Sequence, residues 1–162
     1  MKSEELNIAF IELKDVAYRY AVSLLGQSAE AEDAVQDLYE RLWRRRLLIR
    51  SGGFRALLMT SLRNLCLDRL REKERRRTYE PTDTPAEESP TADKETTDIV
   101  KHLIEQLPTR EREVIHLRDC EGWQFEDIAA VTGASEAAVR VALSRAREKI
   151  RDELSKIMDY GL

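Results

Sequence analysis

The sequence predicts an all-α protein made of two small helical domains joined by a flexible acidic linker. Charged residues make up 36% of the chain and hydrophobic residues 42%, a balance typical of amphipathic helices with solvated outer faces. Aromatic residues reach only 6%, and with six Gly and four Pro a β-sandwich is not expected. Apolar residues recur at helical spacing, and no stretch shows the alternation of a strand.

Three helices are expected in residues 1–77. Ser3 can cap the first, whose apolar residues keep helical spacing until Gly26 ends it. Ser28 can cap the second, because acidic residues follow in its first turn, where the helix dipole favours them. A loop at 51–53 precedes a third helix, which runs from Phe54 to about Arg77. The buried stripe of the second helix is expected to hold Ala31, Val35, Leu38 and Leu42.

Residues 78–97 form the expected linker. They contain three of the four prolines and no Leu, Ile, Val or Phe, so they cannot bury enough apolar surface to offset the entropy of ordering. They also carry six acids and one base, and this charge should extend the segment by self-repulsion. The linker therefore separates a domain at 1–77 from a second domain at 98–162.

Four helices are expected in residues 98–162. Pro108 ends the first and Thr109 can cap the second. A short helix at 125–131, a turn at Gly133 and a long helix capped by Ser135 follow. This order is typical of a helix-turn-helix, whose second helix enters the major groove of DNA. The alternative is a helical hairpin with surface arginines. The residues expected between the two helices are Ile128, Ala129, Val131, Val139, Leu143 and Ala146.

Charge is segregated along the chain, although the formal net charge is only −4. Residues 30–43 hold five acids and one Arg, whereas residues 44–77 hold 12 basic residues and three acids. The basic stretch is a candidate surface for a polyanion, and the acidic helix before it suggests a second partner. Solvated helix faces are the alternative explanation of the same pattern.

Other classes of protein find less support. No apolar run is long enough to span a membrane, and the first five residues include acids where a signal peptide is basic, so a cytoplasmic protein without membrane insertion is expected. Cys66 and Cys120 are too isolated for a disulfide framework or a zinc site, and Cys66 is expected in the core. An enzyme is the main alternative class. However, His102 and His116 lack metal-ligand spacing and suit surface or hydrogen-bonded positions, and no Gly-rich phosphate loop occurs, so no catalytic residue, metal or cofactor is expected.

Four short motifs together resemble one family. They read AEDAVQDLYERLW at 31–43, RNLCLDRLR at 63–71, LPTREREV at 107–114 and SRAR at 144–147. In this order, around the expected linker, they resemble the extracytoplasmic-function (ECF) sigma factors of bacterial RNA polymerase, over about residues 5–77 and 98–155. The resemblance implies a region 2-like domain at 1–77, for core polymerase and the minus-ten element, and a region 4-like helix-turn-helix domain at 98–162, for the minus-thirty-five element.

The resemblance also implies three sets of binding residues. The polymerase-binding set, on an acidic helix face, is Asp33, Gln36, Asp37 and Glu40. The minus-ten set, which would bind opened DNA and enclose a flipped base, is Leu48, Ile49, Arg50, Ser51, Arg63, Asn64, Asp68 and Arg71. The minus-thirty-five set is Ser135, Glu136, Arg140, Val141, Ser144 and Arg145. For Asn64 the alternative is a helix-surface amide. Trp43 would add apolar area for the polymerase. The alternative is that Trp43 is a core residue.

Two segments depart from the family pattern. Many members carry aromatic residues along the third helix, where this chain has Leu57, Leu58 and Met59, and aromatic stacking on opened bases is therefore not expected. The recognition helix reads AVRVA at 138–142, where two polar positions that would face DNA have become apolar. Fewer hydrogen bonds to bases and more contacts with thymine methyl groups are expected there.

The resemblance thus implies a transcription initiation factor that directs core RNA polymerase to specific promoters and helps to melt the minus-ten element. The polymerase, and not this chain, would carry out the catalysis. The implied partners are core RNA polymerase, promoter DNA and an anti-sigma factor. A free-standing helix-turn-helix regulator is the second alternative, but it leaves the acidic and basic segments of residues 1–77 without a role. Dependence on core polymerase separates these two functions.

Overall fold

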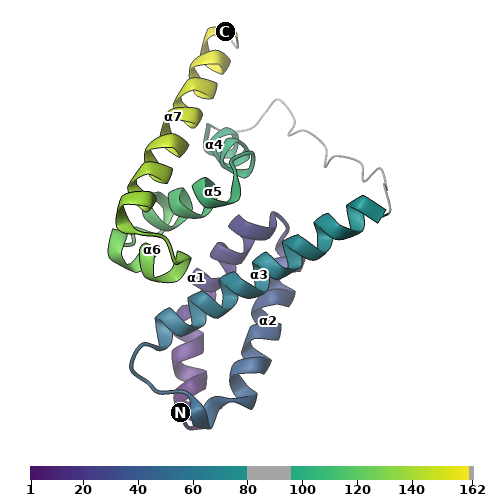
Figure 1. The fold of residues 1–162 in the computed structure, drawn as a ribbon, viewed down its shortest axis with the longest axis vertical. Helices are drawn as coiled ribbons and strands as arrows, with labels where there is room; N and C mark the ends of the chain where they lie inside the picture. The colour runs from purple at the N-terminus through teal and green to yellow at the C-terminus, as the bar shows by residue number, and fades with distance from the viewer. Residues whose placement is uncertain (80–95, 161–162) are drawn as a thin grey trace.

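The computed structural model describes residues 1–79 and 96–160, and every regular element in these ranges is helical (Figure 1). The all-α prediction is therefore confirmed. The N-terminal bundle consists of α1 (Ser3–Leu25), α2 (Ser28–Arg44), the 3-10 turn η1 (Arg46–Leu48) and α3 (Phe54–Tyr79). The C-terminal bundle consists of α4 (Thr96–Glu105), α5 (Thr109–Ile115), the π-helical turn η2 (His116–Cys120), α6 (Phe125–Thr132) and α7 (Glu136–Tyr160).

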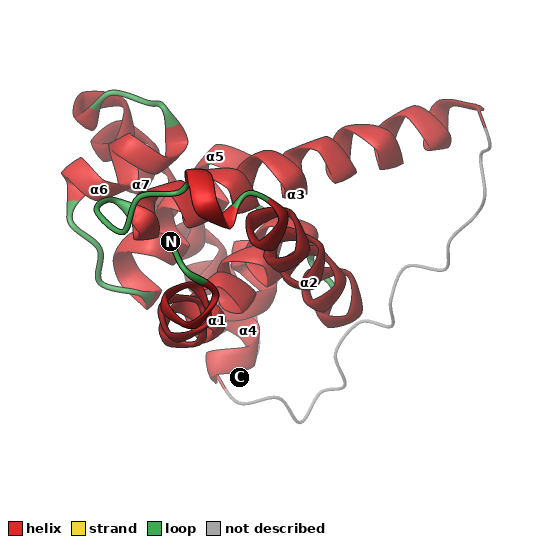
Figure 2. Ribbon diagram, turned by 90° about the horizontal axis from the view of Figure 1, so that it is seen from below, coloured by secondary structure: helices red, strands yellow, loops and turns green. Residues whose placement is uncertain are grey.

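The N-terminal bundle is built on a tight turn between α1 and α2. Gly26 adopts φ 82°, a left-handed conformation that glycine tolerates, and its N–H donates to the carbonyl of Val22 at 2.8 Å. The predicted stripe of α2 is buried, together with Ala34. Helix α3 crosses both helices, and its last turns project beyond the bundle (Figures 1 and 2). Cys66, on α3, lies in the core as expected, and burial raises the pKa of its thiol to about 12.

Three of the predicted helix caps are wrong by one residue. Ser3, Ser28 and Thr109 are the first helical residues, and the residues before them occupy the N-cap position without a side-chain hydrogen bond. An N-cap needs extended backbone, which Gln27 has at φ −130° and ψ 134°. Ser135 is a cap as predicted, because its Oγ accepts the N–H of Ala138 at 3.1 Å.

The helix-turn-helix is present in the C-terminal bundle as α6, a turn and α7. Gly133 adopts φ 74° and its N–H donates to the carbonyl of Ala129 at 2.9 Å, which ends α6 sharply. The side chains expected between the two helices are buried, except that Ala129 is only partly so. The π-helical turn η2, closed by a bond from the N–H of Glu121 to the carbonyl of His116, was not predicted.

The two bundles pack against each other and share one continuous hydrophobic cluster. Helix α5 and turn η2 lie against α1, while α6 lies against α3 (Figure 1). The ends of the expected linker are corrected, since α3 extends through Tyr79 and α4 begins at Thr96. The rest of it, residues 80–95, lies outside the described residues. No helix of ranges 1–79 and 96–160 combines the length and apolar character that a membrane span needs.

Candidate nucleic-acid and polymerase interfaces

A hollow of about 900 Å³ opens between α2, the loop after it and α3. Two backbone hydrogen bonds shape the loop, from the N–H of Leu48 to the carbonyl of Arg45 at 2.9 Å and from Ile49 to Arg46 at 3.2 Å. They hold Ile49 in the core while Leu48 stays exposed. The residues lining the hollow are Leu38, Arg41, Leu42, Arg44, Arg45, Leu48, Ile49, Arg50, Gly52, Gly53, Leu57, Ser61, Asn64, Leu65 and Asp68.

The hollow brings together five of the eight residues of the predicted minus-ten set. These five are Leu48, Ile49, Arg50, Asn64 and Asp68. Ser51 lies in the same exposed loop but does not line the hollow. Arg71 is linked to the hollow through Asp68, whose carboxylate accepts from its guanidinium at 2.9 Å. Arg63 points away from the hollow, toward the C-terminal bundle, where it binds Glu113.

Other residues of the hollow were missed as members of this set. Three further arginines line it: Arg41 and Arg44 at the end of α2, and Arg45 directly after this helix. Arg44 and Arg45 begin the basic stretch that follows the acidic helix, so the charge pattern of the sequence already indicated them. On the α3 wall, Leu57 is exposed toward the hollow, whereas Leu58 and Met59 are fully buried. Of the three positions that depart from the family pattern, Leu57 is therefore the one that is exposed.

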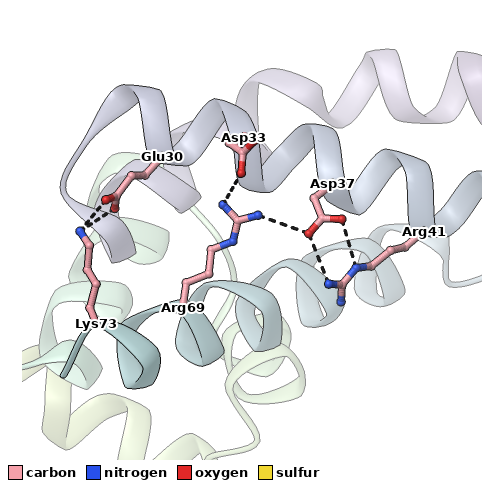
Figure 3. A network of polar contacts seen from close by, with 6 residues as sticks. All are labelled: Glu30, Asp33, Asp37, Arg41, Arg69 and Lys73. Atoms are coloured by element: carbon pink, nitrogen blue, oxygen red, sulfur yellow. Dashed lines mark hydrogen bonds and ion pairs between the residues drawn. The ribbon is translucent and has the colours of Figure 1, made fainter. Parts of the chain in front are cut away.

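The acidic face of α2 is bound to α3 by a network of ion pairs (Figure 3). Arg69 on α3 is its centre, with guanidinium nitrogens 2.8 Å from Asp33 and 3.3 Å from Asp37. Lys73 lies 2.6 Å from Glu30, and Arg41 reaches Asp37 at 3.3 Å along α2. Asp33 keeps 72% of its side chain exposed and Asp37 keeps 33%, so both carboxylates remain reachable from solvent.

The other two residues of the predicted polymerase-binding set lie away from this network. Gln36 lines a groove of about 540 Å³ between α1 and α2, and Glu40 lies beside Tyr39 and Trp43 in a smaller surface hollow. Trp43 is partly buried against the core, with the guanidinium of Arg46 at 4.4 Å from its ring centre. Its position combines a core contact with an edge that lines the surface hollow.

All six residues of the predicted minus-thirty-five set are exposed, at the start of α7 and just before it. The guanidinium of Arg140 lies 4.5 Å from the ring centre of Phe125 on α6, and that of Arg118 lies 4.3 Å from the same ring. Such cation–π contacts orient a planar guanidinium without using its hydrogen-bond donors. Phe125 and Arg118 were not predicted, because nothing in the spacing indicates that the start of α6 supports Arg140.

The two histidines differ in their surroundings. His102 is exposed, whereas His116 is buried in η2, with its Nε2 at 3.3 Å from a carboxylate oxygen of Glu121. Burial lowers the pKa of His116, and the hydrogen bond from Arg19 lowers that of Glu121. The structure describes no group of three His, Cys, Asp or Glu side chains in residues 1–79 and 96–160 that is placed to hold a metal ion.

Comparison with known proteins places the two bundles in one family. Residues 10–76 match the family model of sigma-70 region 2, and residues 97–150 match that of sigma-70 region 4. The chain is 31% identical over 150 residues to the ECF RNA polymerase sigma factor SigE of Mycolicibacterium smegmatis, which covers 88% of the chain. It spans only 58% of the length of SigE.

Two further relatives match over most of their length. The ECF RNA polymerase sigma factor SigL of Mycobacterium tuberculosis is 31% identical over 149 residues, which are 88% of this chain and 84% of SigL. The sigma factor RpoE of Bartonella quintana, solved in complex with the anti-sigma factor NepR, shares the fold with a TM-score of 0.76 and 24% identity, over 92% of this chain and 96% of RpoE. The order of the two regions and the extent of these matches show that the chain belongs to the ECF family of RNA polymerase sigma factors.

Proposed function

We propose that this chain binds core RNA polymerase, directs it to specific promoters and helps to melt the minus-ten element, while the polymerase performs the catalysis. The observation that carries the proposal is the hollow beside α3, in which apolar, amide and cationic side chains meet on a region 2 fold. A region 4 helix-turn-helix with an exposed recognition helix completes the pair of DNA-binding surfaces.

The hollow suits an unstacked base of the opened minus-ten strand. Leu48, Ile49 and Leu57 offer apolar surface to the faces of a base, and the amide of Asn64 can both donate to and accept from its edge. Arginines along the rim would hold the neighbouring phosphates. These are Arg41, Arg44, Arg45 and Arg50. Asn64 is exposed on α3 and lines the hollow, and this position supports the role, although it also fits the alternative of a helix-surface amide.

The exposed face of α7 suits double-stranded DNA. Arg140, oriented on Phe125, can reach a guanine edge or a phosphate, and Val141 presents an apolar side chain for thymine methyl groups. Ser135, Glu136, Ser144 and Arg145 complete the proposed minus-thirty-five surface. Loss of a base contact by Arg140→Ala should weaken binding by about 1–3 kcal/mol, whereas loss of a phosphate contact would lower affinity for all sequences alike.

The exposed carboxylates of α2 suit the polymerase. Asp33, Asp37 and Glu40 project from one helix at positions that a cationic surface of the polymerase could reach, and Gln36 adds an amide nearby. An anti-sigma factor is proposed as a third partner, because the relative RpoE was solved in complex with one.

The proposed function is tested by dependence on core polymerase. The net charge of −4 gives no long-range attraction to DNA, and one helix-turn-helix without a second half-site neutralises few phosphates. Polymerase would hold both bundles at a fixed separation on the promoter and make their second contact intramolecular. A mobility shift at physiological salt should therefore show weak binding by the chain alone and tight promoter binding with core enzyme. Nanomolar, sequence-specific binding that ignores polymerase would identify an independent regulator instead.

The hollow is tested with Asn64→Ala in the same polymerase complex. We expect weaker opening of the minus-ten element, seen as loss of permanganate reactivity, with polymerase binding and folding unchanged. Gln106→Ala, which removes an exposed amide outside the three proposed surfaces, is the control and should melt DNA normally. Unchanged permanganate footprints for Asn64→Ala would remove Asn64 from the site.

A further inference from the structure

We propose that Phe125, which lies outside the recognition helix, is a positioning residue for minus-thirty-five recognition, because its ring holds the guanidinium of Arg140 in place before DNA is bound. The inference rests on the proposed function and deepens it at the region 4 surface. It depends on three side chains, Arg118 on η2, Phe125 at the start of α6 and Arg140 on α7, which we call the ring cluster.

The ring of Phe125 is mounted on a tight turn. Phe125 is the first residue of α6, and part of its side chain packs against the hydrophobic cluster. In the preceding loop, the N–H of Gly122 donates to the carbonyl of Arg118 at 3.1 Å. The N–H of Trp123 donates to the carbonyl of Leu117 at 2.9 Å. Gly122 adopts φ 73°, a left-handed conformation that glycine tolerates, so the chain turns back and α6 starts beside η2.

Arg118 anchors the ring to this turn. Its guanidinium lies 4.3 Å from the ring centre of Phe125, and its Nη1 donates to the carbonyl of Trp123 at 2.7 Å. The hydrogen bond ties the guanidinium to the loop that leads into α6, and the Arg118 side chain is only partly exposed. A guanidinium that is held in this way restricts the movement of the ring it contacts. The ring therefore has a defined position before DNA arrives.

Arg140 meets the same ring from α7. Its side chain is exposed, and its guanidinium lies 4.5 Å from the ring centre of Phe125. Glu136 precedes Arg140 by four residues, which is the spacing of an ion pair along a helix. Arg140 nevertheless forms no ion pair with a residue of 1–79 or 96–160, and it contacts the ring instead. A cation–π contact uses the charge of the guanidinium and leaves its five N–H donors for other partners.

Three arginines in the first half of α7 differ in what holds them. Arg147 forms a bidentate ion pair with Asp119 at 2.6 and 3.0 Å, which already uses two of its donors. Arg145 is exposed, and within the described part of the chain it has neither an ion pair nor an aromatic ring beside it. Arg140 combines free donors with a guanidinium that a ring orients. Of these three arginines, Arg140 is therefore the one prepared for a directed contact with DNA.

Preorganisation explains how the ring acts on DNA binding. A long arginine side chain loses rotamer entropy when it becomes fixed on DNA, and a side chain that is already oriented loses less. A guanidinium binds a guanine edge or a phosphate through two donors that lie in one plane, so the orientation of this plane decides whether both hydrogen bonds form. Phe125 therefore contributes to the affinity for the minus-thirty-five element through Arg140.

A double-mutant cycle tests this role with the full chain bound to core polymerase, by mobility shift on a promoter that the complex transcribes. Phe125→Leu removes the ring and keeps an apolar side chain. An exposed cation–π contact corresponds to about two- to fivefold in affinity, and Phe125→Leu should weaken promoter binding by this factor. In the Arg140→Ala background, Phe125→Leu should have no further effect, because the side chain that the ring orients is gone. In the Arg145→Ala background, the loss of about two- to fivefold should persist.

Nuclear magnetic resonance of the free full chain measures the ring contact itself. The side-chain protons of Arg140, assigned by their loss in Arg140→Ala, should be shifted upfield by the ring of Phe125 and should return to ordinary positions in Phe125→Leu. Phe125→Tyr keeps a ring, so it should retain the upfield shift and restore wild-type affinity. Circular dichroism at 222 nm checks folding, and Phe125→Met takes the place of Phe125→Leu in the cycle if leucine unfolds the chain.

The outcomes separate the positioning role from the proposed function. If the wild-type chain binds promoters with core enzyme but Phe125→Leu causes the same loss with and without Arg140, the ring has only a structural role and the inference is overturned. Unshifted Arg140 protons in the wild-type chain, or unchanged promoter affinity of Arg140→Ala, would overturn it as well, and the proposed function would stand. A wild-type chain that fails to bind promoters with core enzyme would refute the proposed function and the inference that rests on it.

Discussion

Replacing Arg69 with Met should separate the structural role of the α2–α3 network from polymerase docking. Arg69 bridges Asp33 and Asp37 across the two helices, and methionine keeps an unbranched apolar stem while it removes both ion pairs (Figure 3). The matched control is Arg71→Met on the same helix, because within the described residues Arg71 pairs along α3, with Asp68.

The expected magnitudes follow from exposure. Arg69 is 28% exposed and Asp37 33%, so their pair is shielded from solvent, whereas the pair with Asp33 lies at the surface. Together they should contribute about 1 kcal/mol to the free energy of unfolding, at the upper end for exposed pairs. Arg71 is 74% exposed in a local pair, for which about 0.3 kcal/mol is expected.

Urea denaturation followed by circular dichroism measures these differences in the free energy of unfolding.

A polymerase-binding assay tests the docking role. Arg69→Met should bind core enzyme at least as tightly as the wild type, because the substitution frees two carboxylates. Asp37→Asn should bind core enzyme more weakly. Equal destabilisation by Arg69→Met and Arg71→Met would refute the contribution of the cross-helix pairs. Weaker polymerase binding by Arg69→Met than by Asp37→Asn would refute the docking role assigned to the carboxylates.

Two further predictions concern acid and the helix-turn-helix. Arg19 holds the pKa of Glu121 below its usual 4.5, so this pair between the two bundles stabilises the folded chain above that range and is lost as the pH falls through the lowered value. Burial lowers the pKa of His116 from 6.5, so acid below about pH 6.5 protonates the unfolded chain in preference and destabilises the folded one. The free energy of unfolding, measured by urea denaturation, should therefore fall as the pH is lowered below about 6.5 and fall further below about 4.5, and a constant value would contradict the prediction. Leu143→Ala, at the buried contact between α6 and α7, should destabilise the protein by about 2–5 kcal/mol in thermal denaturation. Val141→Ala, at a side chain that is 49% exposed, should change stability by less than about 0.5 kcal/mol, and similar effects of the two would disprove the assigned contact.

The helices themselves were predictable because their signals are local. The spacing of apolar residues predicted α1, α2 and α3. Gly26 and Gly133 adopt left-handed backbone conformations, which glycine tolerates because it has no Cβ. The boundaries were less predictable. Ser28 is helical and Gln27 occupies the cap position, a choice set by backbone torsions that composition does not reveal.

The residues of the candidate site were likewise predictable only in part. Resemblance to the family grouped Leu48 and Asn64, and the structure brings both to one hollow. It also grouped Arg63 with them, yet this side chain turns toward the other bundle. The place of Arg41, Arg44 and Arg45 in the hollow and the support of Arg140 by Phe125 became visible only once the helices were assembled.

The sequence by itself determined the helical class, the order of the two regions, the buried stripes and the segregation of acidic and basic side chains, because each depends on residues within a few turns of one another. Only the tertiary structure decided that Glu113, 50 residues from Arg63 and 93 from Tyr20, is buried between them. The charge pattern of α5 is that of an ordinary amphipathic helix, and nothing local distinguishes Glu113 from Glu111. What differs is the surface that each carboxylate meets when the bundles come together, and that surface belongs to distant parts of the chain.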